Sequence, residues 1–470
     1  MPRGLHPARP TRDHTRMKQL RLMAFDMNCV GHIQQGLWRH PRDRSTDYAS
    51  LDHWVELARL LERGLFDGLF LADVLGVYDV YGGTAEGALR HGVQVPVNDP
   101  LLLVPAMAHA TTHLGFGVTA NLSYEAPYPF ARRMSTLDHL TKGRVGWNIV
   151  TGYLDSAARA MGRAQQVAHD DRYDVADDYM EAVYKLWEGS WADDAVRADR
   201  ATGLYADPAR VRTVRHEGPH VRMEGVHLAE PSPQRTPVLF QAGSSERGRR
   251  FAGLHAECVF LNGGPVPIVA GHVRAIRAAA VEAGRAADDV RCFVGASVVV
   301  AETQALAEAK LADYRRYASP EGALVHASAS LGIDLAAYGM DEPIGAAPTD
   351  AIASNLQAMA QQGMTKRKLL DRMVLGSRQV PIVGDPAQAA DALVTWGAEA
   401  DVDGLILSRT VTPECFADFI ELVVPELQAR GAYKLDHATG TLRRKLGGTD
   451  RLPATHPAAA HRMGRPDRGA

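Results

Sequence analysis

The stretch RRMSTLDHLTKGRVGWNIVTGY, residues 132–153, is the part of the sequence that best indicates the fold class. Its first half predicts a helix, because apolar residues recur at three-residue intervals along it, at Met134, Leu137 and Leu140. Its second half contains Val145–Val150, a short and mostly apolar segment. Such a segment predicts a strand that is buried on both faces, as strands are in parallel sheets. The stretch therefore indicates a helix followed by a parallel strand.

Polar and small residues end this predicted strand: Asn148, Thr151, Gly152 and Tyr153. In a barrel of alternating strands and helices, the carboxyl ends of the strands carry the active site. We therefore interpret these four residues as candidate site residues. The alternative is an ordinary loop between a strand and a helix, with Thr151 as a helix cap.

The composition is that of a globular protein, with 46% hydrophobic and 23% charged residues among 470. A net charge of −3 argues against nucleic acid or an anionic membrane surface as a partner. No apolar run approaches the ~18 residues that a membrane span needs. The cysteines are scattered and form no Cys-x-x-Cys motif, which indicates a reduced, cytoplasmic protein. They are Cys29, Cys258, Cys292 and Cys415.

Strand and helix patterns alternate along the chain, which predicts a parallel α/β sheet. The predicted strands cover residues 21–27, 66–71, 114–120, 145–150, 238–241, 257–261, 293–300 and 404–407. The longer helices are predicted at 48–62, 101–113, 173–188 and 414–430. Eight such units fit a (β/α)8 TIM barrel, and we expect one barrel domain over residues 20–446. A doubly wound sheet is the alternative, but no Gly-x-Gly-x-x-Gly motif follows a strand.

Two long segments interrupt the alternation, near residues 191–233 and 314–378. Long insertions in a compact fold are commonly functional, so we expect both to lie over the carboxyl-terminal mouth of the barrel and the second to act as a lid. Residues 1–19 predict a disordered extension, within which Met17 could be the natural start. Residues 447–470 have little apolar content and predict a flexible tail.

The chemistry of a metal site or a serine hydrolase is not indicated. His109 and His113 are spaced as two helix ligands could be, but a metalloprotease glutamate and a third ligand are missing. No Gly-x-Ser-x-Gly motif is present. We therefore predict no metal ligands.

A phosphate-binding site is indicated instead by Ser244 and Ser245, which follow a strand and open a helix. Backbone N–H groups and hydroxyls would both be available there. Tyr173 could add a phenol from the start of another predicted helix. The alternative for the two serines is simple helix capping.

Three blocks of the sequence carry a resemblance to a known family. They are FLADVLGVYDVYGG (70–83), RRMSTLDHLTKGRVGWNIVT (132–151) and HDDRYDVADDYMEAVYKLWEGSW (169–191). With these blocks the chain resembles the bacterial-luciferase-like FMN-dependent monooxygenases, over residues 20–446. It is most similar to the branch that holds nitrilotriacetate, dibenzothiophene-sulfone, long-chain alkane and dimethyl sulfide monooxygenases.

The resemblance implies roles for particular residues. Asp73, Thr119 and His169 would lie around the flavin, and Tyr173 and Ser245 would bind its phosphate. Helix capping is the alternative role for Asp73.

The resemblance also implies a substrate side of the pocket, made by Cys29, His32, Tyr78, Gln94 and His326. Cys29 and His32 follow the first strand in a Cys-x-Gly-His pattern that the alkane enzymes share. Cys29 could alternatively be a small buried residue.

The reaction that the resemblance implies is the insertion of one oxygen atom from O2 into a small molecule through a C4a-peroxyflavin. The cofactor would be FMN, used as FMNH2 and supplied by a separate NAD(P)H:flavin reductase in a transient partnership. A homodimer or homotetramer is expected. Two other functions stay open: an F420-dependent oxidoreductase of the same fold, and a flavin-binding protein without turnover.

The residue at position 153 bears on the substrate. The resembling alkane enzymes have Thr-Ser-His after the fourth strand, whereas this chain has Thr151-Gly152-Tyr153. A phenol with a reference pKa near ~10 donates a hydrogen bond but is a poor proton carrier at neutral pH. It is also bulkier than an imidazole. We therefore expect a compact apolar or organosulfur substrate, although Tyr153 could instead only pack on the flavin edge.

Overall fold

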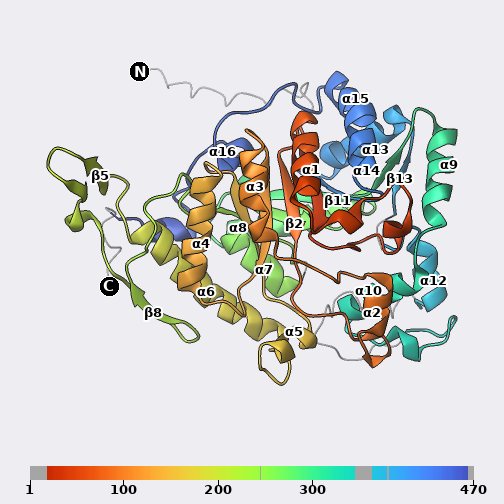
Figure 1. Cartoon of the computed structure of the whole chain (residues 1–470), viewed down its shortest axis with the longest axis horizontal. Helices are drawn as coiled ribbons and strands as arrows, with labels where there is room; N and C mark the ends of the chain where they lie inside the picture. The colour runs from red at the N-terminus through yellow and green to blue at the C-terminus, as the bar shows by residue number, and fades with distance from the viewer. Residues whose placement is uncertain (1–17, 244, 345–362, 378–379, 464–470) are drawn as a thin grey trace, which may run out of the picture.

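The computed structural model describes residues 18–243, 245–344, 363–377 and 380–463, and it contains a closed barrel of eight parallel strands (Figure 1). In chain order the strands are β1 (Arg21–Met27), β2 (Gly68–Ala72), β3 (Gly115–Asn121), β4 (Val145–Val150), β9 (Val238–Gln241), β10 (Cys258–Leu261), β11 (Arg291–Ala296) and β14 (Gly404–Ser408). Each strand pairs with its neighbours in parallel, and β1 closes the barrel against β14. The predicted TIM-barrel fold is confirmed.

The opening stretch folds as predicted into α4 (Pro127–Leu140) and β4. Met134 and Leu137 are buried against the barrel, but Leu140 is 57% exposed. Steps of three residues fall behind the 3.6-residue turn, so Leu140 has rotated away from the face that holds Met134. Gly143, with a φ of 80°, lets the chain turn back into β4.

Most predicted helices occupy the expected segments, as α1 (Leu51–Arg63), α6 (His169–Gly189) and the helices after β14. The predicted helix at 101–113 is shorter, because a separate turn precedes α3 (Val104–His109). Pro105 can occupy only the first turn of a helix, so α3 cannot extend back through it. The last predicted helix is divided into α14 (Glu414–Asp418), a π turn (Phe419–Val423) and α15 (Val424–Ala429).

The predicted strand at 293–300 belongs to two different sheets. Residues up to Ala296 lie in the barrel, whereas β12 (Val298–Val300) pairs with β13 (Ile382–Gly384) outside it. The backbone N–H of Ile382 also donates to the carbonyl of Ser297 at 2.8 Å. The two ends of the long segment between β12 and β13 therefore lie side by side, because these two strands pair with each other.

That segment contains α9 (Gln304–Arg315), α10 (Pro320–Leu331) and α12 (Lys366–Arg372). Helix α10 packs against α2 (Glu86–His91), and the two lie together in Figure 1. Because α2 belongs to the long connection after β2, the second insertion lies at the carboxyl end of the strands. Part of the predicted lid, residues 345–362, lies outside the described residues.

The first insertion does not lie over the mouth, and that prediction is wrong. It forms two hairpins, β5 (Val196–Asp199) with β6 (Leu204–Ala206), and β7 (Val214–Glu217) with β8 (Arg222–Gly225). These hairpins extend to one side beside α4 and α6 (Figure 1). His216 holds this position through a 2.8 Å contact between its Nε2 and Oδ1 of Asp178 on α6. The insertion joins the end of α6 to the start of β9, so it lies toward the amino-terminal end of the strands.

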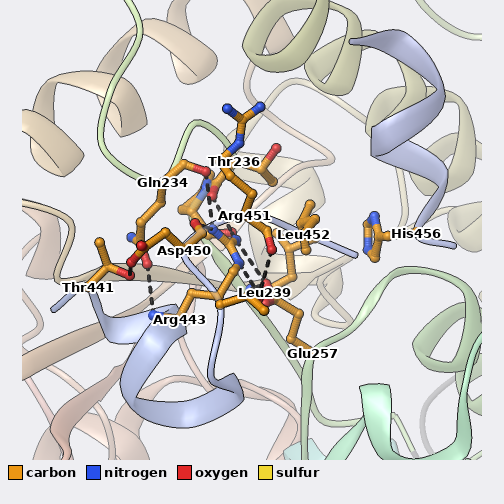
Figure 2. Close-up of polar contacts among 12 residues, drawn as sticks. Gln234, Thr236, Leu239, Glu257, Thr441, Arg443, Asp450, Arg451, Leu452 and His456 are labelled. Atoms are coloured by element: carbon orange, nitrogen blue, oxygen red, sulfur yellow. Dashed lines mark hydrogen bonds and ion pairs between the residues drawn. The ribbon is translucent and has the colours of Figure 1, made fainter. Parts of the chain in front are cut away.

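The amino-terminal end of the barrel is closed by α16 (Leu442–Gly447). Leu442 and Leu446 pack inside it among aromatic side chains that include Phe70 and Phe240. Between these two leucines, Arg443 forms a buried ion pair with Glu257, with a distance of 2.7 Å from Nε to Oε1 (Figure 2).

Residues 448–463 pack against the barrel through buried contacts, so the prediction of a flexible tail is wrong for this part. Glu188, whose side chain is fully buried, accepts from Arg451 Nη2 at 2.6 Å and from Arg462 Nε at 3.0 Å. His456 is also buried, and its Nε2 lies 2.9 Å from the carbonyl oxygen of His255. Charge pairing anchors a segment whose apolar content is low. Residues 1–17 and 464–470 lie outside the described residues.

No helix within the described ranges is long and apolar enough to cross a membrane.

Candidate active site

The carboxyl ends of the barrel strands bring most of the predicted site residues to one mouth. Cys29 and His32 follow β1, Asp73 and Tyr78 follow β2, and Gln94 lies further along the same connection. Thr119 lies on β3, Asn148 lies on β4, and Thr151, Gly152 and Tyr153 follow β4.

Thr119 and Asn148 are register partners on β3 and β4. The Nδ2 of Asn148 donates to Oγ1 of Thr119 at 3.0 Å, which orients the amide. The Oδ1 of Asn148 is buried and has no hydrogen-bond partner within the described part of the chain. A buried acceptor without a partner is costly, so it fits a ligand that presents an N–H or O–H group.

In the connection after β4, Gly152 has a φ of 72° and packs closely against Asn121. A Cβ at this position would lie 2.5 Å from Nδ2 of Asn121. The carbonyl of the preceding Thr151 accepts from Oγ of Ser123 at 2.8 Å. Glycine is therefore needed to place Thr151 and Tyr153 beside the end of β3.

A second group of residues gathers at the start of α7 (Glu246–His255). Ser245 caps this helix, because its Oγ accepts from the backbone N–H of Gly248 at 3.0 Å. The Nε2 of His169 lies 3.4 Å from the same Oγ, and the ring centroid of His169 lies 5.3 Å from that of Tyr173. The predicted trio of His169, Tyr173 and Ser245 is thus together. Ser244 lies outside the described residues.

Glycines bring the backbone close to the Tyr173 hydroxyl. A Cβ at Gly243 would lie 2.8 Å from this oxygen, and a Cβ at Gly248 would lie 2.9 Å from it. Gln241 adds a donor, with its Nε2 lying 3.4 Å from the hydroxyl. Backbone N–H groups at a helix start, a serine and a phenol form the donor set that a phosphate group requires.

Tyr78, Gln94 and Tyr153 form a hydrogen-bonded chain on the other side of the mouth. The Tyr78 hydroxyl donates to Oε1 of Gln94 at 2.7 Å, and it lies 2.6 Å from the Tyr153 hydroxyl. Since the Tyr78 proton is directed at Gln94, the bond between the tyrosines has Tyr153 as its donor. Gln94 has a φ of 52°, in the left-handed region that few non-glycine residues occupy.

Helix α10 of the second insertion contributes His326, whose ring centroid lies 5.6 Å from that of Tyr78. Tyr78 also belongs to a cluster of apolar side chains. The same hydrophobic cluster contains Val74, Leu75, Val77, Val93, Leu154 and Val325. This side of the mouth therefore favours an apolar ligand with few polar groups.

Cys29 and His32 lie on the loop after β1. Cys29 is fully buried, and burial raises the pKa of its thiol to about 12, so the group stays protonated. His32 packs edge-on against Phe25 with a centroid distance of 4.5 Å. Burial is the main cause that lowers the pKa of His32 well below its ordinary value, with the nearby Arg409 as the next cause.

Asp73 has an unusual carboxyl group for a residue at the end of a strand. Burial raises its pKa to about 7, and the charge of Asp99 adds to this increase. The group is therefore poised near neutrality, as acid–base groups in active sites often are.

Comparison with known protein families identifies the family to which this barrel belongs. The family model for luciferase-like monooxygenases matches residues 24–403. The chain belongs to the luciferase-like monooxygenase family. It is 48% identical to the long-chain alkane monooxygenase of Geobacillus thermodenitrificans (strain NG80-2), over 95% of this chain and 98% of that protein. It is 47% identical to the dimethyl-sulfide monooxygenase of Hyphomicrobium sulfonivorans, over 95% and 94% of the two chains.

A solved structure of a riboflavin lyase with modified FMN and its substrate riboflavin is also similar. It has 42% sequence identity and a TM-score of 0.90, and the match covers 95% of this chain and all of that one. The predicted family is thus confirmed, and this luciferase-like monooxygenase is an enzyme, as the names of its relatives show.

Three polar residues at the carboxyl ends of the strands were not selected by the sequence analysis: Asp26, Gln241 and Arg409. Asp26 interrupts an apolar strand, and Arg409 directly follows another strand. A charged residue within or next to a buried strand could have identified both from the sequence. Gln241 ends β9 in the same way. Among the residues that the structure describes, no cluster of histidine, cysteine and carboxylate side chains could hold a metal ion.

Proposed function

We propose that this chain is the oxygenase component of a two-component, FMNH2-dependent monooxygenase that acts on a small apolar or organosulfur molecule. One observation carries the proposal: a donor-rich cradle at the start of α7 and an apolar cluster that contains Tyr78 and Tyr153 both lie at the carboxyl end of the barrel. The first suits a phosphate group, and the second suits an apolar substrate. The names of two relatives, an alkane and a dimethyl-sulfide monooxygenase, support the substrate class.

The FMN phosphate would be held by Ser245 Oγ, the Tyr173 hydroxyl and backbone N–H groups at the start of α7. His169, beside Ser245, would add a donor to the phosphate. On the ring side, Asn148 would present its buried Oδ1, oriented by Thr119, to an N–H group of the flavin. When bound, reduced FMN supplies the activation of O2 that oxygen insertion requires.

The protein residues would hold the substrate and exclude water. The apolar cluster around Tyr78 removes water from the reacting groups, which lengthens the lifetime of water-sensitive intermediates. Tyr153 can turn its hydroxyl from Tyr78 toward the substrate side and donate one hydrogen bond there. Asp73, poised near neutrality, could release or take up a proton at its carboxyl oxygen.

We propose further that the reduced flavin comes from a separate NAD(P)H:flavin reductase in a transient partnership. We also propose that the enzyme is a cytoplasmic homodimer or homotetramer. The first point can be tested in solution, because a chain that depends on a reductase should not oxidise NADH by itself. If the purified chain with added FMN oxidised NADH at a catalytic rate, the two-component proposal would be wrong.

The decisive experiment combines the purified chain with a flavin reductase, NADH, FMN and 18O2. Candidate substrates are n-alkanes, dialkyl sulfides, aryl sulfones, aminopolycarboxylates and riboflavin, and products are read by mass. We expect one 18O atom in the product of an apolar or sulfur compound. Tight flavin binding without any labelled product would favour a non-catalytic flavin protein. Turnover that depends on reduced F420 instead of FMNH2 would favour the oxidoreductase alternative.

A further inference from the structure

A buried ion pair joins β1 to the segment after β14, next to the loop that carries Cys29 and His32. Asp26, inside β1, is fully buried, and Arg409, just after β14, is 4% exposed. Arg409 Nη1 lies 3.0 Å from Asp26 Oδ1, in contact as an ion pair and not as an aligned hydrogen bond. The same carboxyl oxygen accepts from the backbone N–H of Met27 at 2.7 Å.

Arg409 reaches from the end of one barrel strand to the loop of its neighbour. Its Nη2 donates to the carbonyl oxygens of Cys29 at 3.0 Å and Val30 at 2.7 Å. Its backbone N–H also donates to the carbonyl of Phe25. The guanidinium therefore holds the first turn of the loop that carries Cys29 and His32.

The other side of this loop is held by backbone contacts. Cys29 bridges to Val97, and Gly31 bridges to Val93. A Cβ at Gly31 would lie 2.2 Å from the carbonyl oxygen of Gly92, so the two segments are in close approach. The loop is thus held by backbone contacts with the 92–97 segment and by the guanidinium of Arg409.

The charge of Arg409 also acts on His32. Among the described residues, the charged or titratable groups that act on His32 are Arg409, which follows β14, and His326 from α10, and both disfavour a protonated imidazole. His32 Nδ1 is buried and has no partner in the described part of the chain. A neutral ring with a free nitrogen can accept or donate one hydrogen bond to a ligand at the mouth.

We propose that Arg409, oriented by Asp26, is the positioning residue of the substrate side and fixes the loop that carries Cys29 and His32. Stability alone does not account for this pair, since replacing a buried ion pair by apolar residues is often neutral or favourable for stability. The proposal rests on the proposed function for the meaning of the substrate side. The positions of Cys29 and His32 can nevertheless be measured without turnover.

The test compares Arg409→Met, Arg409→Lys and the neutral pair Asp26→Asn/Arg409→Met with wild type. Arg285→Met is the matched control, because Arg285 is also a buried arginine that donates to carbonyls, at Gly253 and Ala256, on α7 and its connection. Circular dichroism and thermal unfolding establish that each variant folds. The first readout is the NMR titration of His32, assigned with His32→Gln.

We expect the His32 pKa to rise in Arg409→Met and in the neutral pair, because a neighbouring cation is removed. It should stay low in Arg409→Lys and in the control. The second readout is the rate at which Cys29 reacts with a thiol reagent, followed by peptide mass spectrometry. Loss of the guanidinium that donates to the carbonyls of Cys29 and Val30 should raise this rate about tenfold in both the Met and the Lys variant, the scale of one hydrogen bond to a charged group.

An unchanged His32 pKa and unchanged Cys29 labelling in folded Arg409→Met would overturn the proposal. If Arg409→Met does not fold, Asp26→Asn decides, because it leaves Arg409 without its orienting partner. Cys29 labelling at the wild-type rate in Asp26→Asn would then overturn the proposal. A chain that binds no substrate would refute the proposed function and still leave both readouts measurable.

Discussion

The hydroxyl groups of Tyr78 and Tyr153 lie 2.6 Å apart across the barrel mouth. They come from the connections after β2 and β4, so their contact spans the end of β3, which lies between these two strands. Gln94 accepts the Tyr78 proton, which leaves Tyr153 as the donor in this contact. Any change at Tyr153 therefore alters both the size of the pocket and the hydrogen-bonded chain.

The first prediction concerns substrate length. Wild type should turn over small dialkyl sulfides and should turn over hexadecane poorly, because the phenol shortens the space beside Tyr78. Tyr153→His should improve hexadecane relative to the sulfides. Tyr153→Phe keeps the size and removes the bond, so it should reduce kcat/KM by about 5-fold without changing the preference, a loss of ~1 kcal/mol. Efficient wild-type turnover of hexadecane, unaffected by Tyr153→His, would contradict this prediction.

The second prediction concerns the cradle at α7. Tyr173→Phe should weaken flavin binding by about 1–2 kcal/mol, the scale of one hydrogen bond to a charged group. Titration of FMN into each protein measures the affinity. Tyr205→Phe is the control, because Tyr205 is an exposed tyrosine on the β6 hairpin that donates to Glu230. Equal affinities for all three proteins would mean that Tyr173 only packs against its neighbours.

The third prediction concerns the pH dependence of stability at Asp73. The folded pKa of about 7 lies above the ordinary value of 3.8, so the folded state retains a proton that the unfolded state has lost. Ionisation of Asp73 therefore costs stability increasingly between pH 4 and pH 7, and the cost is constant above that range.

Asp73→Asn lacks this cost, so it should gain stability relative to wild type as the pH rises to 7 and then keep a constant advantage. Urea unfolding of both proteins at pH 5, 6, 7 and 8 measures the difference. A difference that does not change across this range would show that Asp73 titrates as it does in water.

The fourth prediction concerns the closed end of the barrel. Arg443→Met should destabilise the fold by about 3–5 kcal/mol, because it leaves Glu257 buried without its cation. Arg443→Met/Glu257→Gln should recover part of that loss. Arg444→Met is the control, since Arg444 is half exposed and pairs with Asp450, a kind of contact worth at most about 1 kcal/mol. Urea unfolding of the four proteins is the measurement, and equal losses for Arg443→Met and Arg444→Met would refute this account.

Local patterns were sufficient for the barrel itself. β1, β4 and β9 were predicted with the bounds that the structure shows, because short apolar segments between turn residues can be read without their neighbours. Helix ends were less accurate where a proline or a π turn changed the hydrogen-bond pattern, as in α3 and at Phe419–Val423. The division between β11 and β12 was not predicted, because it depends on the pairing of β12 with β13. The first residue of β13, Ile382, is 82 residues beyond Val300 in the sequence.

By itself, the sequence determined the parallel barrel and the identity of the polar residues at the strand ends, because period and position along a strand are local properties. Only the tertiary structure decided which of these residues meet. It placed the 191–233 insertion away from the mouth. It also showed that residues 447–463 are anchored by ion pairs with Glu188, and that Arg409 donates to the backbone of the loop that carries Cys29. Each of these contacts joins segments far apart in the chain, and their burial and charge pairing arise only when the barrel closes and places those segments side by side.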